Sequence, residues 1–133
     1  MSYQAAQASG EPLNATKPSI EMAVEQAKKV DRIIVFTKSD QEIPQGQIDL
    51  VNGLIATGKP VVTVSLGNPS DLLGYPDVKA YVSAYALDNW YWITPIPVSW
   101  DAAVKVIFGS KPKGRLPVTI NTNYPRAFGL SYP

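Results

Sequence analysis

Apolar and polar residues follow each other in blocks along this chain, and the blocks predict strands and helices in turn. The mostly apolar runs at 33–36 and 61–66 are typical of strands that are buried on both faces of a parallel sheet. Residues 80–86 predict a third strand and residues 116–120 a fourth. The tail, 124–133, is a candidate for a short edge strand.

Apolar residues at helical spacing predict helices between these strands. The predicted helices cover 19–30, 47–57 and 99–108. A short further helix is expected to begin at Asn68 and Pro69, because Asn is a favoured N-cap and Pro a favoured first helical residue. Asp71, in the same first turn, is expected to help satisfy its free N–H groups. Gly58 and Gly109 occupy the positions of helix-terminating glycines.

Strands that alternate with helical crossover connections indicate a mostly parallel sheet with helices on both faces. We therefore expect an α/β fold, a three-layer α/β/α sandwich with a mostly parallel sheet of about five strands, flavodoxin-like in architecture. Residues 1–17 are expected to form a loose lead-in, and residues 18–133 the folded domain.

Composition narrows the possible chemistry. The 133 residues include no Cys and no His, which excludes a disulfide framework, a thiol nucleophile and an imidazole general base. The 12 basic and 11 acidic residues give a net charge of +1 without a run of like charges, so we expect neither a nucleic acid nor a membrane as partner. Residues 1–12 lack the features of a signal peptide. No glycine-rich phosphate-binding motif is present, and we expect neither a cofactor nor a metal.

Three ordered stretches resemble a known family. They are Thr57–Val62 running on to Leu66–Leu73, then Pro76–Tyr81 followed by Ala84-Tyr85, and finally 102–109, Gly114–Ile120 and Phe128–Tyr132. Together they resemble the C-terminal α/β domain of glycoside hydrolase family 3, over nearly everything from Pro18 to Tyr132. The Asn68-Pro69-Ser70-Asp71-Leu72 element is most similar to the β-N-acetylhexosaminidase branch, and the β-glucosidase type is the other comparison.

The resemblance implies an accessory role. Members of the family carry a barrel domain that holds the nucleophilic aspartate of a retaining reaction, and in the hexosaminidase branch the barrel also holds an Asp-His acid/base pair. This chain has no such barrel and no His, so we expect it to be inactive alone. As a fragment or a stand-alone copy, it would take part in hydrolysis of β-N-acetylglucosaminides or β-glucosides only together with a barrel domain, in cis or in trans.

Two carboxylates follow the first predicted strand. Asp40 and Glu42 lie in a loop at the carboxyl end of that strand, where open parallel sheets bind their ligands. In β-glucosidase-type relatives a glutamate of the C-terminal domain is the acid/base, and Glu42 falls in a broadly similar region. The loop here is shorter and lacks the surrounding motif. Glu42 is therefore a candidate acid/base and both residues are candidate substrate contacts, against the alternative of a solvated polar loop.

An aromatic segment gives the second set of candidates. Its polar groups suit sugar hydroxyls and its rings can stack on sugar faces. The candidate substrate contacts are Asp88, Asn89, Trp90 and Trp92. The competing interpretation is that these rings cover the core or meet another domain.

Other functions remain open beside the accessory role. The resemblance implies that the family's domain begins one strand and one helix earlier than this chain, so we expect a sheet edge that is open for a second copy. A self-associating or protein-docking module and a carbohydrate-binding module are thus alternatives. A flavodoxin-like nucleotide or flavin binder shares the architecture but not the phosphate-binding signature.

Overall fold

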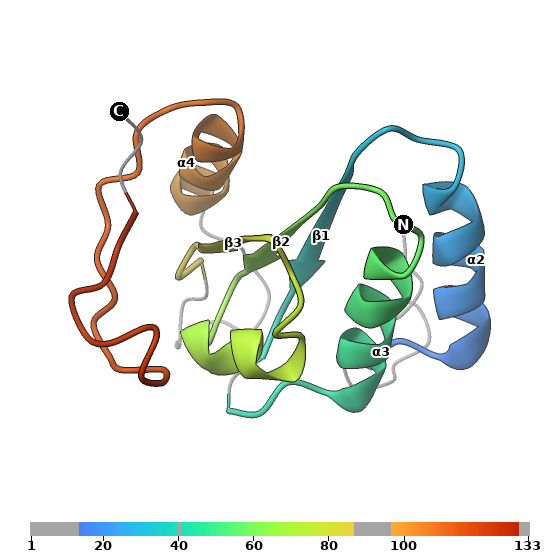
Figure 1. Cartoon of the computed structure of the whole chain (residues 1–133), viewed down its shortest axis with the longest axis horizontal. Coiled ribbons are helices and arrows are strands. Elements are labelled where there is room, and N and C mark those ends of the chain that lie inside the picture. The colour runs from blue at the N-terminus through green and yellow to red at the C-terminus, as the bar shows by residue number, and fades with distance from the viewer. Residues whose placement is uncertain (1–13, 40, 87–96, 131–133) are drawn as a thin grey trace.

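The computed structural model describes residues 14–39, 41–86 and 97–130, and these form one α/β unit (Figure 1). In chain order the elements are α2 (Lys17–Ala27), β1 (Ile33–Thr37), α3 (Gln45–Ile55), β2 (Val61–Ser65), the 3-10 helix η1 (Pro69–Gly74), β3 (Ala80–Ser83) and α4 (Pro97–Ile107). The alternation of strands and helices confirms the predicted α/β class.

The described strands form one parallel sheet in the order β1-β2-β3. Ile33 lies opposite Val61, and Val62 lies opposite Ala80. Each parallel pair needs a crossover connection, and α3 and η1 supply the two crossovers. Beyond Ser83 the third strand continues to bond to β2, but Tyr85 has a φ of 48°, a left-handed value that interrupts the regular ladder. The predicted strand at 80–86 therefore ends early.

One face of the sheet is covered by α3, and α2 packs against α3 (Figure 1). Alternate residues of the strands point to this face, and Val51 of α3 is fully buried against them. The buried residues of this first core are Ala27, Ile33, Val35, Leu50, Val51, Leu54, Val61 and Tyr75. The core explains why these two helices form where the helical spacing predicted them.

The opposite face carries a smaller apolar core beneath α4. Val64 and Ala103 are buried there, and the rings of Phe36 and Trp100 stack with their centroids 4.9 Å apart. Ile34, on the same face near the start of β1, stays 40% exposed. Helices thus pack on both faces of the sheet, but in the described part of the chain the second face is covered only partly.

Several predicted helix ends are confirmed. Gly58 and Gly109 have φ values of 74° and 103°, the left-handed conformation that follows a helix and that suits glycine. The Asn68 side chain accepts a hydrogen bond of 2.9 Å from the backbone N–H of Ser70, as expected for an N-cap. No helix among the described residues is long and apolar enough to cross a membrane.

The predicted strand at 116–120 is wrong. Residues 111–130 instead form an extended hairpin, which we call the C-terminal arm, and its two legs bond to each other. Leu116 donates to the carbonyl of Phe128, and Ala127 donates to the carbonyl of Leu116, each at 2.8 Å. Pro117 lacks an N–H, so this run cannot pair as an inner strand of the sheet.

The described sheet therefore has three strands rather than about five. In the candidate edge-strand tail, the described residues make only an isolated bridge between Asn121 and Tyr124, and residues 131–133 lie outside the described part. The full five-stranded sandwich of the sequence-based prediction is accordingly not seen. What the structure confirms is the α/β class and the parallel centre of the sheet.

Candidate functional site

Polar side chains gather at the carboxyl ends of β1 and β2, the edge at which open parallel sheets bind their ligands. We call this group the carboxyl-edge cluster. Its members are Ser39, Ser65, Asn68 and Asp71. Ser65 ends β2, Ser39 follows β1, and the other two residues begin η1. The cluster thus joins three segments that are separated in the sequence.

The carboxylate of Asp71 is the centre of the cluster. Its Oδ1 accepts a hydrogen bond from the hydroxyl of Ser39, and its Oδ2 accepts one of 2.9 Å from the hydroxyl of Ser65. The Ser65 hydroxyl also lies 3.0 Å from the carbonyl oxygen of Asn68. Asp71 is 3% exposed and Ser65 is fully buried. Asp71 therefore ties η1 to the ends of both strands, instead of satisfying helical N–H groups as the sequence led us to expect.

Burial sets the electrostatics of this carboxyl group. It raises the pKa of Asp71 above its usual value, and the hydrogen bonds from Ser39 and Ser65 oppose that rise only in part. Within the described ranges no Lys or Arg forms an ion pair with Asp71, since the ion pair found there joins Glu25 and Lys28. The group is thus held by neutral hydroxyls.

Two tyrosine side chains hold η1 and the segment after it against the sheet. The hydroxyl of Tyr75 lies 2.9 Å from that of Thr37 at the end of β1, and the hydroxyl of Tyr81 donates to the carbonyl of Pro69 at 3.0 Å. Burial raises the pKa of both tyrosines far above the usual value, so both hydroxyls stay protonated. These contacts join η1 to the end of β1 and to β3.

The loop that carries Glu42 is held at both ends. Near its start, the Gln47 side chain bonds to both the backbone N–H and the carbonyl of Lys38, at 2.8 and 2.9 Å. Farther along, the Asn68 side chain donates to the carbonyl of Gln41 at 2.8 Å. The contact between Ser39 and Asp71 adds a third anchor. The position of this loop is therefore determined by α3 and by the carboxyl-edge cluster together.

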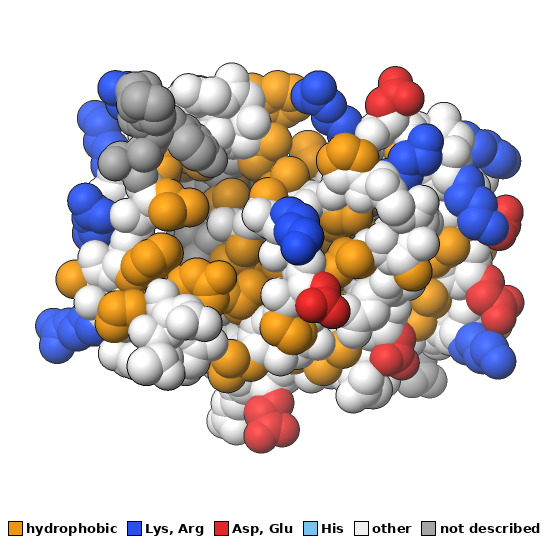
Figure 2. Space-filling view, in the orientation of Figure 1, with side chains coloured by type: hydrophobic (Ala, Val, Ile, Leu, Met, Phe, Trp, Pro, Cys, Tyr) orange, Lys and Arg blue, Asp and Glu red, His pale blue; other side chains and the backbone are white. Residues whose placement is uncertain are grey.

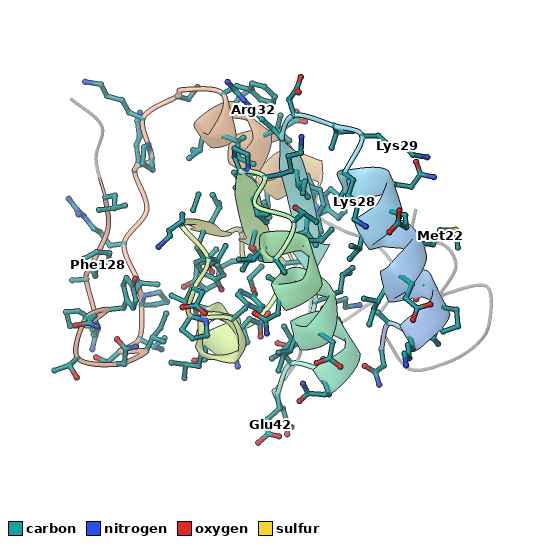
Figure 3. The ribbon with its side chains drawn as sticks, turned by 45° about the vertical axis from the view of Figure 1, so that its right-hand side comes forward. Met22, Lys28, Lys29, Arg32, Glu42 and Phe128 are labelled. Carbon is teal, nitrogen blue, oxygen red and sulfur yellow. The ribbon has the colours of Figure 1, made fainter. Side chains whose placement is uncertain are left out.

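Glu42 is presented to solvent by this loop. Glu42 is exposed, and Figure 3 shows its side chain extending away from the ribbon beside the start of α3. Asp40, its predicted partner, lies outside the described residues. The same holds for Asp88, Asn89, Trp90 and Trp92, which stay predicted substrate contacts.

The cluster is suited to support rather than to reaction. Ser39 is 4% exposed and Ser65 is fully buried, so neither hydroxyl can reach a substrate. No three acidic side chains gather to hold a metal ion in the ranges that the structure covers. Sequence reasoning missed this network, although serines at the ends of two adjacent parallel strands were a usable signal, because such ends meet at one edge of a sheet.

This chain is similar in sequence to a known protein family and to a curated protein. The glycosyl hydrolase family 3 C-terminal domain matches residues 3–129. The periplasmic beta-glucosidase of Salmonella typhimurium is 34% identical in an alignment 125 residues long, which covers 83% of this chain and 15% of that protein. The chain thus spans a small part of this curated relative. No solved structure matches.

Proposed function

Because this chain belongs to the glycosyl hydrolase family 3 C-terminal domain family, we propose that it is an accessory domain that completes the sugar site of a barrel domain. The observation that carries the proposal is the carboxyl-edge cluster, in which a buried carboxylate fixes a loop that exposes Glu42. Glycoside hydrolysis normally uses two carboxyl groups about 5 to 9.5 Å apart. In this proposal the chain presents at most one of them.

The proposed division of labour follows from the loop. Asp71 bonds to Ser39 and Asn68 bonds to Gln41, and Glu42, the residue after Gln41, extends away from the ribbon toward whatever covers the edge. Once a barrel is docked, Glu42 serves as the acid/base or as an acceptor for a sugar hydroxyl, and Asp40 is a second proposed substrate contact. The barrel supplies the aspartate that attacks the sugar and forms the covalent intermediate of a retaining reaction.

We propose that the bonds hydrolysed are O-glycosyl bonds of β-glucosides or β-N-acetylglucosaminides. The name of the Salmonella relative supports the first class, and the Asn68–Leu72 element supports the second. The assembled enzyme can be assayed on aryl derivatives of both sugars. The higher kcat/KM value identifies which of the two substrate classes it prefers.

The proposal is tested by placing Glu42→Gln in the assembled enzyme. If Glu42 is the acid/base, kcat falls by roughly 10²- to 10⁴-fold, and if it only contacts a hydroxyl the loss is smaller. Glu21→Gln, an exposed glutamate on α2, is the matched control and should leave activity unchanged. The chain alone should hydrolyse neither aryl substrate. Turnover by the chain alone that Glu42→Gln abolishes would show that the domain is itself an enzyme.

Self-association is the second candidate function, and the sheet order favours it. In the described sheet β1 is a terminal strand and pairs only with β2, which leaves one edge of β1 available for pairing. Sedimentation velocity at increasing protein concentration should then show a dimer. A monomer at all concentrations would remove this candidate.

A further inference from the structure

Charge is divided unevenly along the chain, although it nearly balances overall. All 11 acidic residues lie within residues 1–101, together with seven of the 12 basic residues. The five that follow are Lys105, Lys111, Lys113, Arg115 and Arg126. A stretch of net charge −4 is therefore followed by one of +5, which together give the +1 of the whole chain.

The basic groups are displayed by the C-terminal arm. Lys111, Lys113, Arg115 and Arg126 are all exposed, and none belongs to the ion pair found in the described residues. Lys111, Lys113 and Arg115 alternate along one leg, a spacing that places side chains on one side of an extended backbone. In Figure 2 the flank on the left, where Figure 1 places the arm, shows Lys and Arg side chains and no Asp or Glu.

The same region also exposes apolar side chains. Phe108, just before the arm, is 76% exposed, and Val118 and Leu130 within it are 46% and 66% exposed. The rings of Tyr124 and Phe128 meet edge to face, 5.3 Å apart, and neither apolar core includes a residue of the arm. Exposed apolar residues together with arginine and aromatic rings are typical of a surface that another protein covers.

The flank of a second copy that lies opposite its arm is a poor match for the arm. The exposed charges of α2 and of the segment after it are mixed, since both acidic and basic side chains lie there: Lys17, Glu21, Glu25, Lys28, Lys29, Asp31 and Arg32. The Salmonella relative, in contrast, has 85% of its length outside the region that matches this chain. A longer protein of this kind has ample surface to cover the arm.

We propose that the C-terminal arm is the docking surface for the barrel domain, and that the barrel face it meets is acidic with an apolar centre. This inference rests on the proposed accessory function and names the surface and chemistry of that association. Complementary charge would steer the two domains together, and burial of Val118 and Leu130 would hold them.

The test measures binding of the whole chain to a separately produced family 3 barrel domain from the same organism, by fluorescence anisotropy at low and high salt. The arm variant carries Lys111→Glu, Lys113→Glu and Arg115→Glu. The matched control carries Lys17→Glu, Lys29→Glu and Arg32→Glu, the same change of charge at exposed positions on or just after α2, at the other end of the molecule (Figures 1 and 3).

We expect the arm variant to bind at least about tenfold more weakly than the wild type, and the control to stay within about twofold. High salt should weaken wild-type binding to the barrel domain and should have little effect on the residual binding of the arm variant. A Val118→Ser, Leu130→Ser double variant should also bind more weakly, with less dependence on salt. All five arm positions are exposed, but Arg115 also donates to the carbonyl of Gly129 in the other leg of the arm at 2.6 Å. A variant with Lys111→Glu and Lys113→Glu alone leaves this bond intact and should still bind more weakly than the wild type.

Two results would overturn the inference separately from the proposed function. If the wild type binds the barrel and the arm variant matches the control, docking occurs elsewhere and the proposed function stands. If the wild type does not bind the barrel at all, both fail. Retention of the wild type on immobilised alginate, lost in the arm variant and without arm-dependent barrel binding, would identify an anionic polysaccharide as the occupant and would also overturn the inference.

Discussion

At the scale of single residues, Asp71 shows how position decides the role of a side chain. The sequence places it in the first turn of a helix, where acidic residues usually satisfy N–H groups. In the fold η1 lies against the ends of two strands, and the carboxylate instead accepts hydrogen bonds from Ser39 and Ser65. Asn68, in the same turn, is the cap that the sequence indicated. Local capping rules predicted the role of Asn68, whose partner is close in sequence. They missed the role of Asp71, whose partner Ser39 is distant in sequence.

The raised pKa of Asp71 predicts a pH dependence. As the pH rises from about 4, the unfolded chain loses this proton before the folded chain does, so the folded state is the form that binds more protons. The stability of the wild type relative to Asp71→Asn should therefore fall as the pH rises through this window, and level off above the folded-state pKa. Urea unfolding of both proteins from about pH 3 to about pH 8 measures the difference. A difference that grows with pH would mean that the folded-state pKa is lowered.

Gly58 gives a second prediction at this scale. Its φ of 74° is left-handed, and a side chain there is strained even though a Cβ would meet nothing within 4 Å. Gly58→Ala should lower the free energy of unfolding by about 1 kcal/mol. Gly114→Ala is the control, because that position also has open space and its φ is not left-handed, and it should change stability by less than about 0.5 kcal/mol. Equal effects of the two substitutions would contradict this explanation.

At the scale of elements, burial determined which predictions succeeded. The runs at 33–36 and 61–66 are strands whose residues on the α3 face are buried in the first core, while the second face is covered fully only at β2 and Ile34 of β1 stays exposed. Helical spacing located α2, α3 and α4 to within a few residues. The run at 116–120 looks similar in sequence, but Pro117 interrupts it and the arm shares neither core. An apolar run shows that a segment can be buried, but it does not show what covers it.

A matched pair of leucines tests the importance of the first core. Leu54 of α3 is 5% exposed, and Leu54→Ala should lower the free energy of unfolding by about 2 to 5 kcal/mol, because it removes buried methyl groups and leaves a cavity. Leu73 of η1 is 53% exposed, and Leu73→Ala should cost less than about 1 kcal/mol. Chemical denaturation of both variants gives the comparison. A similar loss in both would mean that the α3 face is not the main core.

At the scale of the whole molecule, the parallel centre of the fold was predictable and its periphery was not. Strand and helix alternation fixes how neighbouring elements pair, whereas the number of strands and the course of the arm depend on contacts far apart in sequence. The candidate site also has one part that the sequence predicts and one part that it does not. Glu42 is a candidate because its loop follows a strand, but the anchors from Asn68 and Asp71 that hold this loop come from the next crossover.

We propose above all that this domain completes the sugar site of a barrel domain and does not catalyse alone. The most direct test of this claim is to titrate the chain into a separately produced family 3 barrel domain and to follow kcat/KM on aryl β-glucoside and aryl β-N-acetylglucosaminide. We predict a saturable rise in activity with one of these substrates, and no turnover by the chain alone. Barrel activity that stays constant throughout the titration, or hydrolysis by the chain without the barrel, would contradict the claim.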